Sequence, residues 1–359
     1  GLNTVIPYAD DLYHKARPTL RHTKQQVIRL NDHVGLHSGM QGLKPLWEKG
    51  HLAVIQGVGY PNPDRSHFEA MDIWHLADPG RTLKTGWLGR ASAEMDNRAG
   101  GIPILHVGAG KAPLAAASTQ GNNAVSLGDQ KAFKLETGNG DRSEARRKLL
   151  DAVSPAPTKG TAEEDDLLSF VQRRQVQTLT AVDNLKELLD GPGAVRTFTA
   201  GLQQKFQLIA GLIARGFGTR IFYVSLDGFD THSEQGPAHQ HLLSQLASGI
   251  GDFFRELKET GNDDRVRVMT FSEFGRRVRE NGSRGTDHGA GSCMLVAGPG
   301  MKGGVVGKHP SLADLDSDDL KYHTDFRRVY ATLLDKWLNC DSKSVLGAQW
   351  DHVKELANG

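Results

Sequence analysis

The chain has 359 residues, of which 38% are hydrophobic and 24% charged, a composition typical of a globular protein. Its 43 basic and 42 acidic residues nearly cancel, so no overall field favours nucleic acid or an anionic membrane as a partner. No run of about 18 apolar residues occurs, which argues against a membrane span. The two cysteines form no C-x-x-C pair, which argues against a structural zinc site and a disulfide scaffold.

Short β-rich runs alternate with helical patterns along the chain. In order, the sequence predicts a strand at 51–60, a helix at 66–77, a strand at 102–107, helices at 163–189 and 195–215, a strand at 220–226, a helix at 235–260, strands at 265–271 and 292–298, and a helix at 324–339. The last three strands are nearly continuous apolar runs, as expected for strands buried on both faces of a parallel sheet. The alternation predicts an α/β sandwich with a mostly parallel central sheet.

One stretch departs from this pattern. Residues 109–162 are rich in Gly, Ala, Ser, Asn and charged residues, and contain a Gly-Asn-Gly turn at 138–140. We interpret them as a cap or insertion over the sheet, so that residues 1–359 form a single domain.

The segment SLDGFDTH at 225–232 follows a predicted buried strand directly. In open α/β sheets ligands bind at the carboxyl ends of strands, so Asp230 and His232 are candidate ligands of one divalent metal. Asp227 is an alternative ligand or a support for the turn. Alternatively, these residues form no metal site: Asp230 caps the following turn, and His232 lies on the surface.

Two later segments place further polar residues beside predicted strands. Glu273 follows the strand at 265–271, and His288, with Asp287 as second choice, stands between glycines just before the strand at 292–298. Both are candidate metal ligands, and Arg276, on the helix expected after Glu273, is a candidate for holding an anionic substrate. Alternatively, Glu273 lies in the first turn of that helix, where an acid favours the helix dipole, and 285–291 is a surface turn.

Ser66 opens the predicted helix at 66–77, and Glu69 three residues later fits a capping box. Judged locally, Ser66 is best explained as an N-cap. The same position also suits a nucleophile, because helix amides stabilise an anionic centre.

With these segments in order, the chain resembles an exported bacterial family of unknown function that is grouped with the alkaline phosphatase and sulfatase superfamily. The matching runs are GLNTVIPY at 1–8, SHFEAMDIW at 66–74, GWLGR at 86–90, DGFDTHSEQ at 227–235, TFSEFGR at 270–276, TDHGAGSCMLVAGPGMKGG at 286–304 and TDFRRVYATLLDKWL at 324–338. They extend over almost the whole chain. The resemblance implies an alkaline-phosphatase-like three-layer sandwich, and export to the periplasm or the cell exterior.

The resemblance also implies roles for single residues. Ser66 falls on the nucleophile position, while Asp230, His232, Glu273 and His288 fall on metal-ligand segments of the superfamily. Two departures reduce the expected metal count to one divalent ion, Zn, Ca, Mg or Mn. Phe274 stands where the superfamily has a histidine, and the first strand with its Asp, which should precede GLNT, is not in this sequence.

The sequence therefore predicts a metal-dependent hydrolase of phosphate or sulfate esters that uses Ser66 or a metal-activated water. The expected substrate is an anionic small molecule or glycan ester, held by Arg65, Arg90 or Arg276, and His67 is a further site candidate. The alternative is an exported binding or surface protein that keeps the fold without catalysis. Substrate and oligomeric state are left open.

Overall fold

A computed structural model describes residues 1–95, 102–119, 124–127 and 201–356. The predicted helix at 163–189 and most of the predicted insertion at 109–162 lie outside the described residues.

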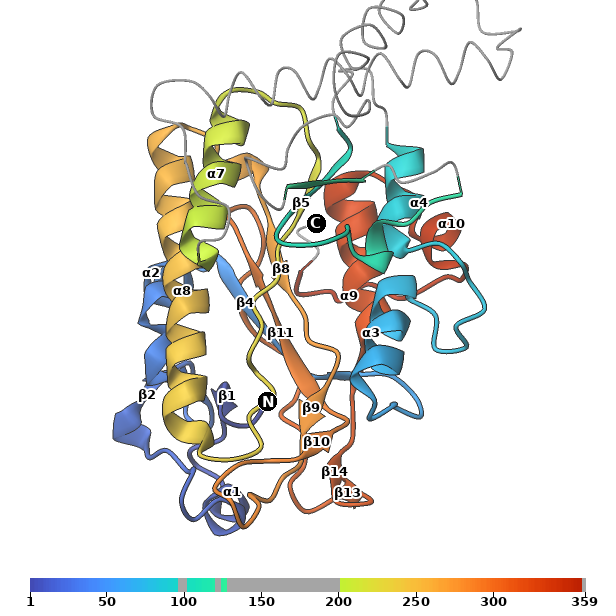
Figure 1. The fold of residues 1–359 in the computed structure, drawn as a ribbon. Helices are drawn as coiled ribbons and strands as arrows, with labels where there is room; N and C mark the ends of the chain where they lie inside the picture. The colour runs from blue at the N-terminus through green and yellow to red at the C-terminus, as the bar shows by residue number, and fades with distance from the viewer. Residues whose placement is uncertain (96–101, 120–123, 128–200, 357–359) are drawn as a thin grey trace, which may run out of the picture.

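A five-stranded sheet forms the centre of the molecule (Figure 1). It contains β4 (Leu52–Gly59), β8 (Val268–Thr270), β11 (Ser292–Ala297), β12 (Gly304–Val306) and β15 (Thr324–Asp325). The order is β12-β4-β11-β8, and β15 also pairs with β4. β12 and β15 run parallel to β4, whereas β11 is antiparallel to both β4 and β8. The sheet is therefore mixed, whereas the sequence predicted a mostly parallel one. A continuous apolar run indicates that a strand is buried on both faces, but it does not indicate the direction of the strand.

A second sheet is wholly parallel. Its order is β6-β5-β7, formed by β6 (Ala124–Leu127), β5 (Ile104–Val107) and β7 (Ile221–Tyr223). β6 falls within the range predicted as an insertion, so this part of the range adds a strand to a sheet.

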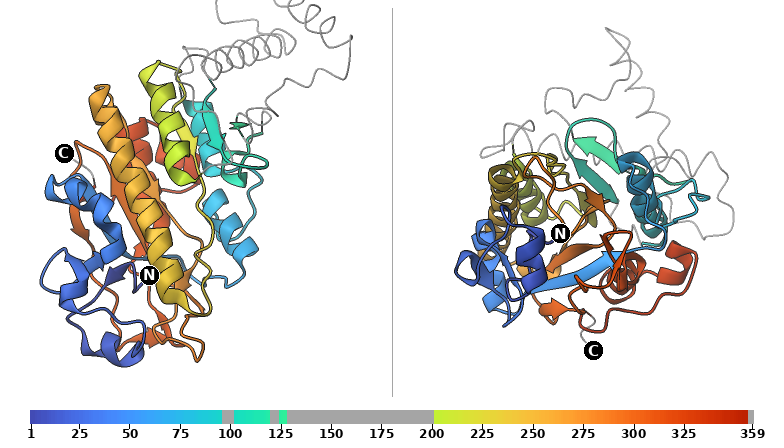
Figure 2. Two further views of the ribbon diagram at one scale, coloured as in Figure 1. Left: turned by 60° about the vertical axis from the view of Figure 1, so that its left-hand side comes forward. Right: turned by 90° about the horizontal axis from the view of Figure 1, so that it is seen from below.

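Helices cover both faces of the central sheet (Figures 1 and 2). Along β4, Val54 belongs to one hydrophobic core, while its neighbours Ala53 and Ile55 belong to another, because successive side chains of a strand point to opposite faces. The first core contains residues of α7 (Leu202–Ala214) and α8 (Gln235–Glu259). The second core contains residues of α3 (His67–Leu76), α4 (Trp87–Glu94), α9 (Phe326–Leu333) and α10 (Ser342–Leu346).

The predicted helices at 66–77, 235–260 and 324–339 are found with small shifts at their ends, and α9 continues into a π-helix at Leu334–Leu338. α7 covers most of the helix predicted at 195–215, and residues 195–200 of that range lie outside the described residues. No helix among the described residues has the length and apolar character needed to cross a membrane.

The smaller elements lie around this framework. They are α1 (Asp11–Ala16), α2 (Lys44–Glu48), the antiparallel strands β1 (Val5–Ile6), β3 (Gly35–His37) and β2 (Val27–Arg29), the ribbon of β9 (Gly275–Arg276) with β10 (His288–Gly289), and the hairpin of β13 (Leu315–Asp316) with β14 (Asp319–Leu320). The ribbon β9–β10 replaces the helix that the sequence predicted after Glu273, and that prediction is wrong. Two glycines in the ribbon, Gly275 and Gly289, allow its backbones to pack closely.

Candidate metal centre

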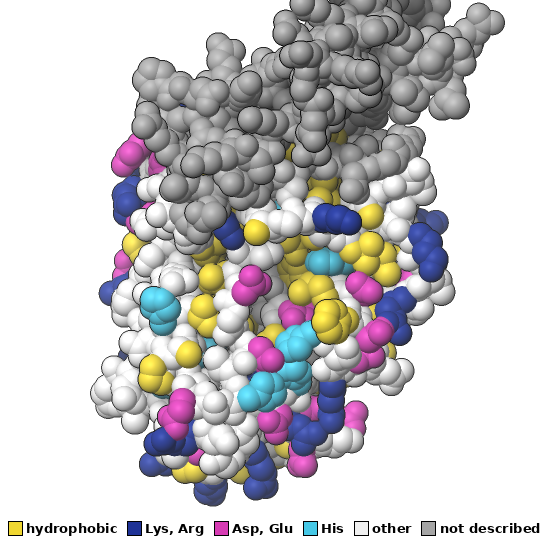
Figure 3. Space-filling model, viewed as in Figure 1, with side chains coloured by type: hydrophobic (Ala, Val, Ile, Leu, Met, Phe, Trp, Pro, Cys, Tyr) yellow, Lys and Arg dark blue, Asp and Glu magenta, His cyan; other side chains and the backbone are white. Residues whose placement is uncertain are grey.

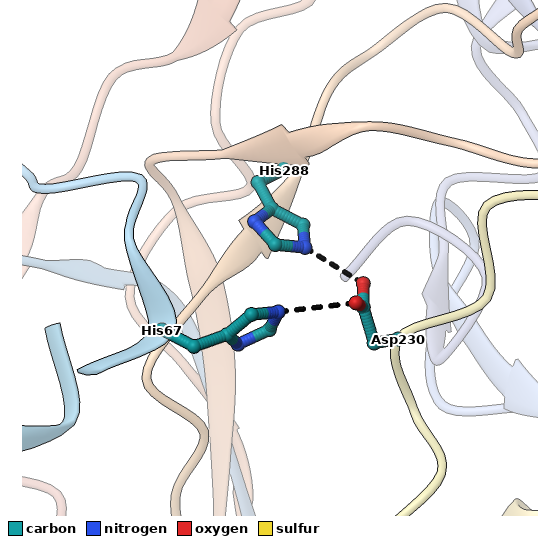
Figure 4. Close-up of side chains that lie close together, drawn as sticks. All are labelled: His67, Asp230 and His288. Atoms are coloured by element: carbon teal, nitrogen blue, oxygen red, sulfur yellow. Dashed lines mark hydrogen bonds and ion pairs between the residues drawn. The ribbon is translucent and has the colours of Figure 1, made fainter.

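Imidazole rings from three separate segments converge on the carboxylate of Asp230. The Nε2 atoms of His288 and His232 lie 2.7 and 2.8 Å from its Oδ1. On the other side, Nε2 of His67 faces Oδ2 at 3.1 Å without the alignment of a hydrogen bond (Figure 4). The ligand atoms of His67, Asp230 and His288 all lie within 4.8 Å of one another.

The fold brings these side chains together from distant parts of the sequence. Asp230 and His232 lie in the loop between β7 and α8, His67 is the first residue of α3, and His288 opens β10. Figure 3 shows histidine and acidic side chains gathered on one face of the molecule. His232 is exposed, whereas His67 and His288 are half-buried.

The other nitrogen of each ring, Nδ1, contacts an oxygen that can only accept a hydrogen bond. For His67 it is Glu273 Oε1 at 2.8 Å, for His288 the backbone carbonyl of Arg65 at 3.1 Å, and for His232 a longer contact to Asp287 Oδ1 at 3.4 Å. A neutral imidazole that donates from Nδ1 carries its lone pair on Nε2. In this tautomer the three rings direct their lone pairs at the negatively charged carboxylate.

Lone pairs facing an anionic oxygen at 2.7–2.8 Å repel one another unless a positive charge lies between them. Either protons on Nε2 or a metal cation supplies that charge. The Nε2 atoms of His232 and His288 are 3.2 Å apart, close to the separation of roughly 3.3 Å between two ligands that bind one tetrahedral zinc at about 2.0–2.1 Å. The three carboxylates of Asp230, Glu273 and Asp287 outnumber the two guanidinium groups of Arg276 and Arg277 that act on them, which also favours a cation.

The pKa values of the metal-free site show how strongly its charges interact. Burial raises the pKa of Asp230, but the hydrogen bond with His288, the contact with His67 and the charges of His288 and His232 outweigh it and lower the pKa to about 2. Burial also lowers the pKa of His67, but contacts with Glu273 and Asp230 outweigh it and raise that pKa above 6.5. The carboxylate thus stays ionised and acts as the anionic centre of the site.

Glu273 was predicted as a direct ligand, but the structure places it behind His67. Its Oε1 accepts from Nδ1 of His67, on the far side of the ring from Asp230. A carboxylate in this position orients a metal-binding imidazole and raises its basicity. His67, a secondary candidate from the sequence, is the residue that faces Asp230. It is the first residue of α3 and follows Ser66 directly.

Ser66 is the N-cap residue of α3 and is exposed, but its side chain makes no capping hydrogen bond. The capping box expected with Glu69 is therefore not formed. The backbone amide of Ser66 donates instead to Asp64 Oδ1 at 2.8 Å, which fixes the turn before the helix. Asp227, the alternative ligand, is exposed and is not among the residues that contact Asp230.

The three arginines predicted to bind an anion have different surroundings. Arg276 is buried, and its guanidinium donates to the carbonyls of Thr286 and Phe229 and to Asp230. Burial lowers the pKa of Arg276, while the nearby charge of Asp230 opposes this effect. The guanidinium of Arg276 therefore supports the centre from within the protein.

Arg90 is remote from the centre. Its guanidinium donates to the backbone carbonyls of Leu76, Thr85 and Val345, and burial lowers its pKa to about 10. It joins the end of α3 to α10. Arg65 alone keeps half of its side chain exposed, with Nη2 bound to Asp319 Oδ2 at 2.8 Å.

An aromatic ring, that of Phe274, occupies the position where the sequence resemblance led us to expect another histidine. The ring of Phe274 stacks on His288 with centroids 4.8 Å apart and meets the edge of His67 at 5.0 Å. The guanidinium of Arg276 lies 4.8 Å from the centroid on the same ring. Phe274 therefore packs the wall of the centre and offers no ligand for a second ion.

Sequence reasoning missed two supporting residues. Asn281 donates to the carbonyl of His232 at 2.9 Å and to Asp287 Oδ1 at 3.2 Å, and so connects two segments of the site. Asp319 holds Arg65. Neither has a local signal, because each acts through contacts with residues far away in the sequence.

Comparison with known proteins identifies a family but no activity. Residues 22–349 match the family described as "Protein of unknown function (DUF1501)", and the chain belongs to this family. No curated protein and no solved structure matches the chain. Any function must therefore be argued from the site itself.

Proposed function

We propose that this member of the family is a hydrolase of phosphate or sulfate esters that depends on one divalent metal ion. The observation that carries the proposal is the convergence of three Nε2 atoms on Asp230, each ring being held through Nδ1 by an acceptor oxygen. Histidines that bind metals through one ring nitrogen usually donate a hydrogen bond from the other nitrogen to such an oxygen.

His67, Asp230 and His288 would hold the ion, with His232 as the fourth ligand. Three nitrogens and one carboxylate favour zinc over calcium, magnesium and manganese, which prefer sites made of oxygen. His232 is the most exposed of the three histidines, with 46% of its side chain accessible. It is therefore the ligand most readily exchanged for water or substrate.

When bound, the ion would polarise the ester oxygen and make a bound water more acidic. Asp230 fixes the centre, Glu273 keeps His67 in its ligating orientation, and Arg276 balances the charge of Asp230. Among the arginines, Arg65 is the proposed contact for the anionic group, because its side chain is half exposed. We favour water over Ser66 as the nucleophile. The imidazole lone pairs converge on Asp230, and the Ser66 side chain makes no capping hydrogen bond.

We also propose that the fold is of the alkaline phosphatase type and that the protein is exported. Helices on both faces of the sheet and a site in the loops beyond β7 and β8 support the first part. Phe274 supports a single ion in place of the usual pair. Export follows from the resemblance alone.

The test is hydrolysis of aryl phosphates and aryl sulfates by protein loaded separately with zinc and manganese. His288→Ala should abolish activity and metal binding, and the matched control His241→Ala, an exposed histidine of α8 outside the centre, should retain both. Ser66→Ala should keep most of the activity if water is the nucleophile. Tight metal binding without hydrolysis of any ester would favour the exported binding protein, and failure of the wild-type protein to bind metal would overturn the proposal.

A further inference from the structure

Asp319 is a buried acid next to the candidate centre that takes no direct part in it. Its side chain is 6% exposed, and Oδ2 accepts a hydrogen bond of 2.8 Å from Arg65 Nη2. The other oxygen, Oδ1, is buried and has no hydrogen-bond partner among the described residues. Burying a half-satisfied carboxylate is unfavourable, so its position calls for a reason beyond stability.

The partner of Asp319 also contacts the centre through its backbone. The carbonyl of Arg65 accepts a hydrogen bond from Nδ1 of His288 at 3.1 Å. Arg65 lies two residues before His67 on the same chain segment. A single ion pair therefore restrains the segment that supplies one ligand directly and orients another.

Asp319 also packs against the strand that carries His288. A Cβ atom added at Gly289 would lie 2.8 Å from Asp319 Oδ1 and 2.7–2.8 Å from the backbone of Arg276 and Arg277, closer than real Cβ contacts. A glycine at this place in β10 therefore leaves room both for the neighbouring strand and for the carboxylate. Asp319 thus contacts both sides of the hydrogen bond between Arg65 and His288, through Arg65 on one side and Gly289 on the other.

We propose that Asp319 is a positioning residue of the metal centre: through Arg65 it holds the carbonyl that fixes His288 as the Nδ1–H tautomer, so that Nε2 is presented to the ion. The tautomer and the role of the ion both rest on the proposed function, because a cation must lie between Nε2 and Asp230 when Nε2 carries a lone pair. Loss of Asp319 frees the Arg65 segment and leaves His288 able to rotate or to exchange tautomers. Residues that support a metal-binding histidine in this way change metal affinity by about 10- to 100-fold.

The first test uses the zinc-loaded full chain, because only a cation between Nε2 and Asp230 lets Nε2 carry a lone pair there. Imidazole ¹⁵N shifts should show His288 bound to zinc through Nε2 and protonated at Nδ1 in the wild-type protein. In zinc-loaded Asp319→Ala the Nδ1 proton should exchange faster with solvent, because the Arg65 carbonyl no longer holds it. Exchange as slow as in the wild-type protein would overturn the proposal.

The second test measures zinc affinity by competition with a chelating dye. Asp319→Ala should bind zinc roughly 10- to 100-fold more weakly, whereas Asp314→Ala should bind like the wild type. Asp314 is the matched control, because it lies just before the same hairpin and pairs with exposed Lys321. If Asp319→Ala fails to fold, Asp319→Asn, which keeps the side-chain volume, decides the question.

A double-mutant cycle shows whether Asp319 acts through Arg65. The double variant Arg65→Ala/Asp319→Ala should lose no more zinc affinity than the more affected single variant, since both remove the same link. Fully additive losses would overturn the proposed route. Zinc affinity within twofold of the wild type in Asp319→Ala would overturn the positioning role itself. Absence of zinc binding by the wild-type protein would instead overturn the proposed function.

Discussion

Replacing Asp230 with asparagine in the metal-free protein should lower the free energy of unfolding by about 1 kcal/mol near neutral pH. Burial alone would raise the pKa of Asp230, but the hydrogen bond with His288 and the contact with His67 outweigh it and lower the pKa from 3.8 to about 2 in the folded protein. A difference of about 1.8 corresponds to roughly 2.4 kcal/mol. With 43% of the side chain exposed, solvent screens these contacts, and we expect about half of that value or less.

The sign of the pH dependence follows from the lowered pKa. The carboxyl is easier to ionise in the folded protein, so its stabilisation is fully present above a pH of about 4 and disappears as the pH falls towards about 2. Urea denaturation of wild type and Asp230→Asn, with a chelator present, should give a difference that shrinks over this window. Asp227→Asn, in the same loop and exposed, should show no such difference. Equal stability of wild type and Asp230→Asn near neutral pH would refute the reasoning, and so would a gap that persists at a pH of about 2.

Three further predictions follow from single contacts. Phe274→His, which places an imidazole next to His288, should raise the metal content measured by elemental analysis from one ion towards two; a content fixed at one would contradict our reading of Phe274. Arg90→Met should cost about 2–3 kcal/mol in thermal unfolding, because three carbonyls lose their donor; a loss below about 0.5 kcal/mol would show that water replaces the guanidinium. Gly285→Ala should weaken zinc binding at least roughly tenfold, since the new Cβ would lie 2.1 Å from the carbonyl oxygen of His232; unchanged affinity in a folded variant would refute this.

The sequence predicted the elements of the fold better than their arrangement. Apolar runs located β4, β5, β7, β8 and β11, because burial on both faces leaves a direct trace in residue type. The antiparallel direction of β11 cannot be read from its residue types, since strand direction depends on how the chain returns to the sheet. The helix predicted after Glu273 became the ribbon β9–β10 for a related reason: Gly275 packs against the backbone of Gly291, a contact between segments that are distant in the sequence.

The site was predictable in its residues but not in its geometry. Asp230, His232 and His288 come together as their places next to strands suggested, and their role in binding metal stays a prediction. Glu273 was ranked above His67 as a ligand, whereas the structure turns His67 towards Asp230, and the metal-binding role of either stays a prediction. Residue type makes both good ligands, and only the fold decides which one faces Asp230 and which one stands behind it.

This order matters for chemistry as well as for geometry. If Glu273 were a ligand itself, the centre would gain an oxygen and a negative charge, and calcium or magnesium would suit it better. Because Glu273 bonds to Nδ1 of His67, its charge instead raises the basicity of an imidazole, and the inner donors become three nitrogens and one carboxylate. One hydrogen bond of 2.8 Å therefore moves the expected metal from the hard cations towards zinc. Phe274 offers no ligand for a second ion beside Glu273, so we expect one ion at this centre.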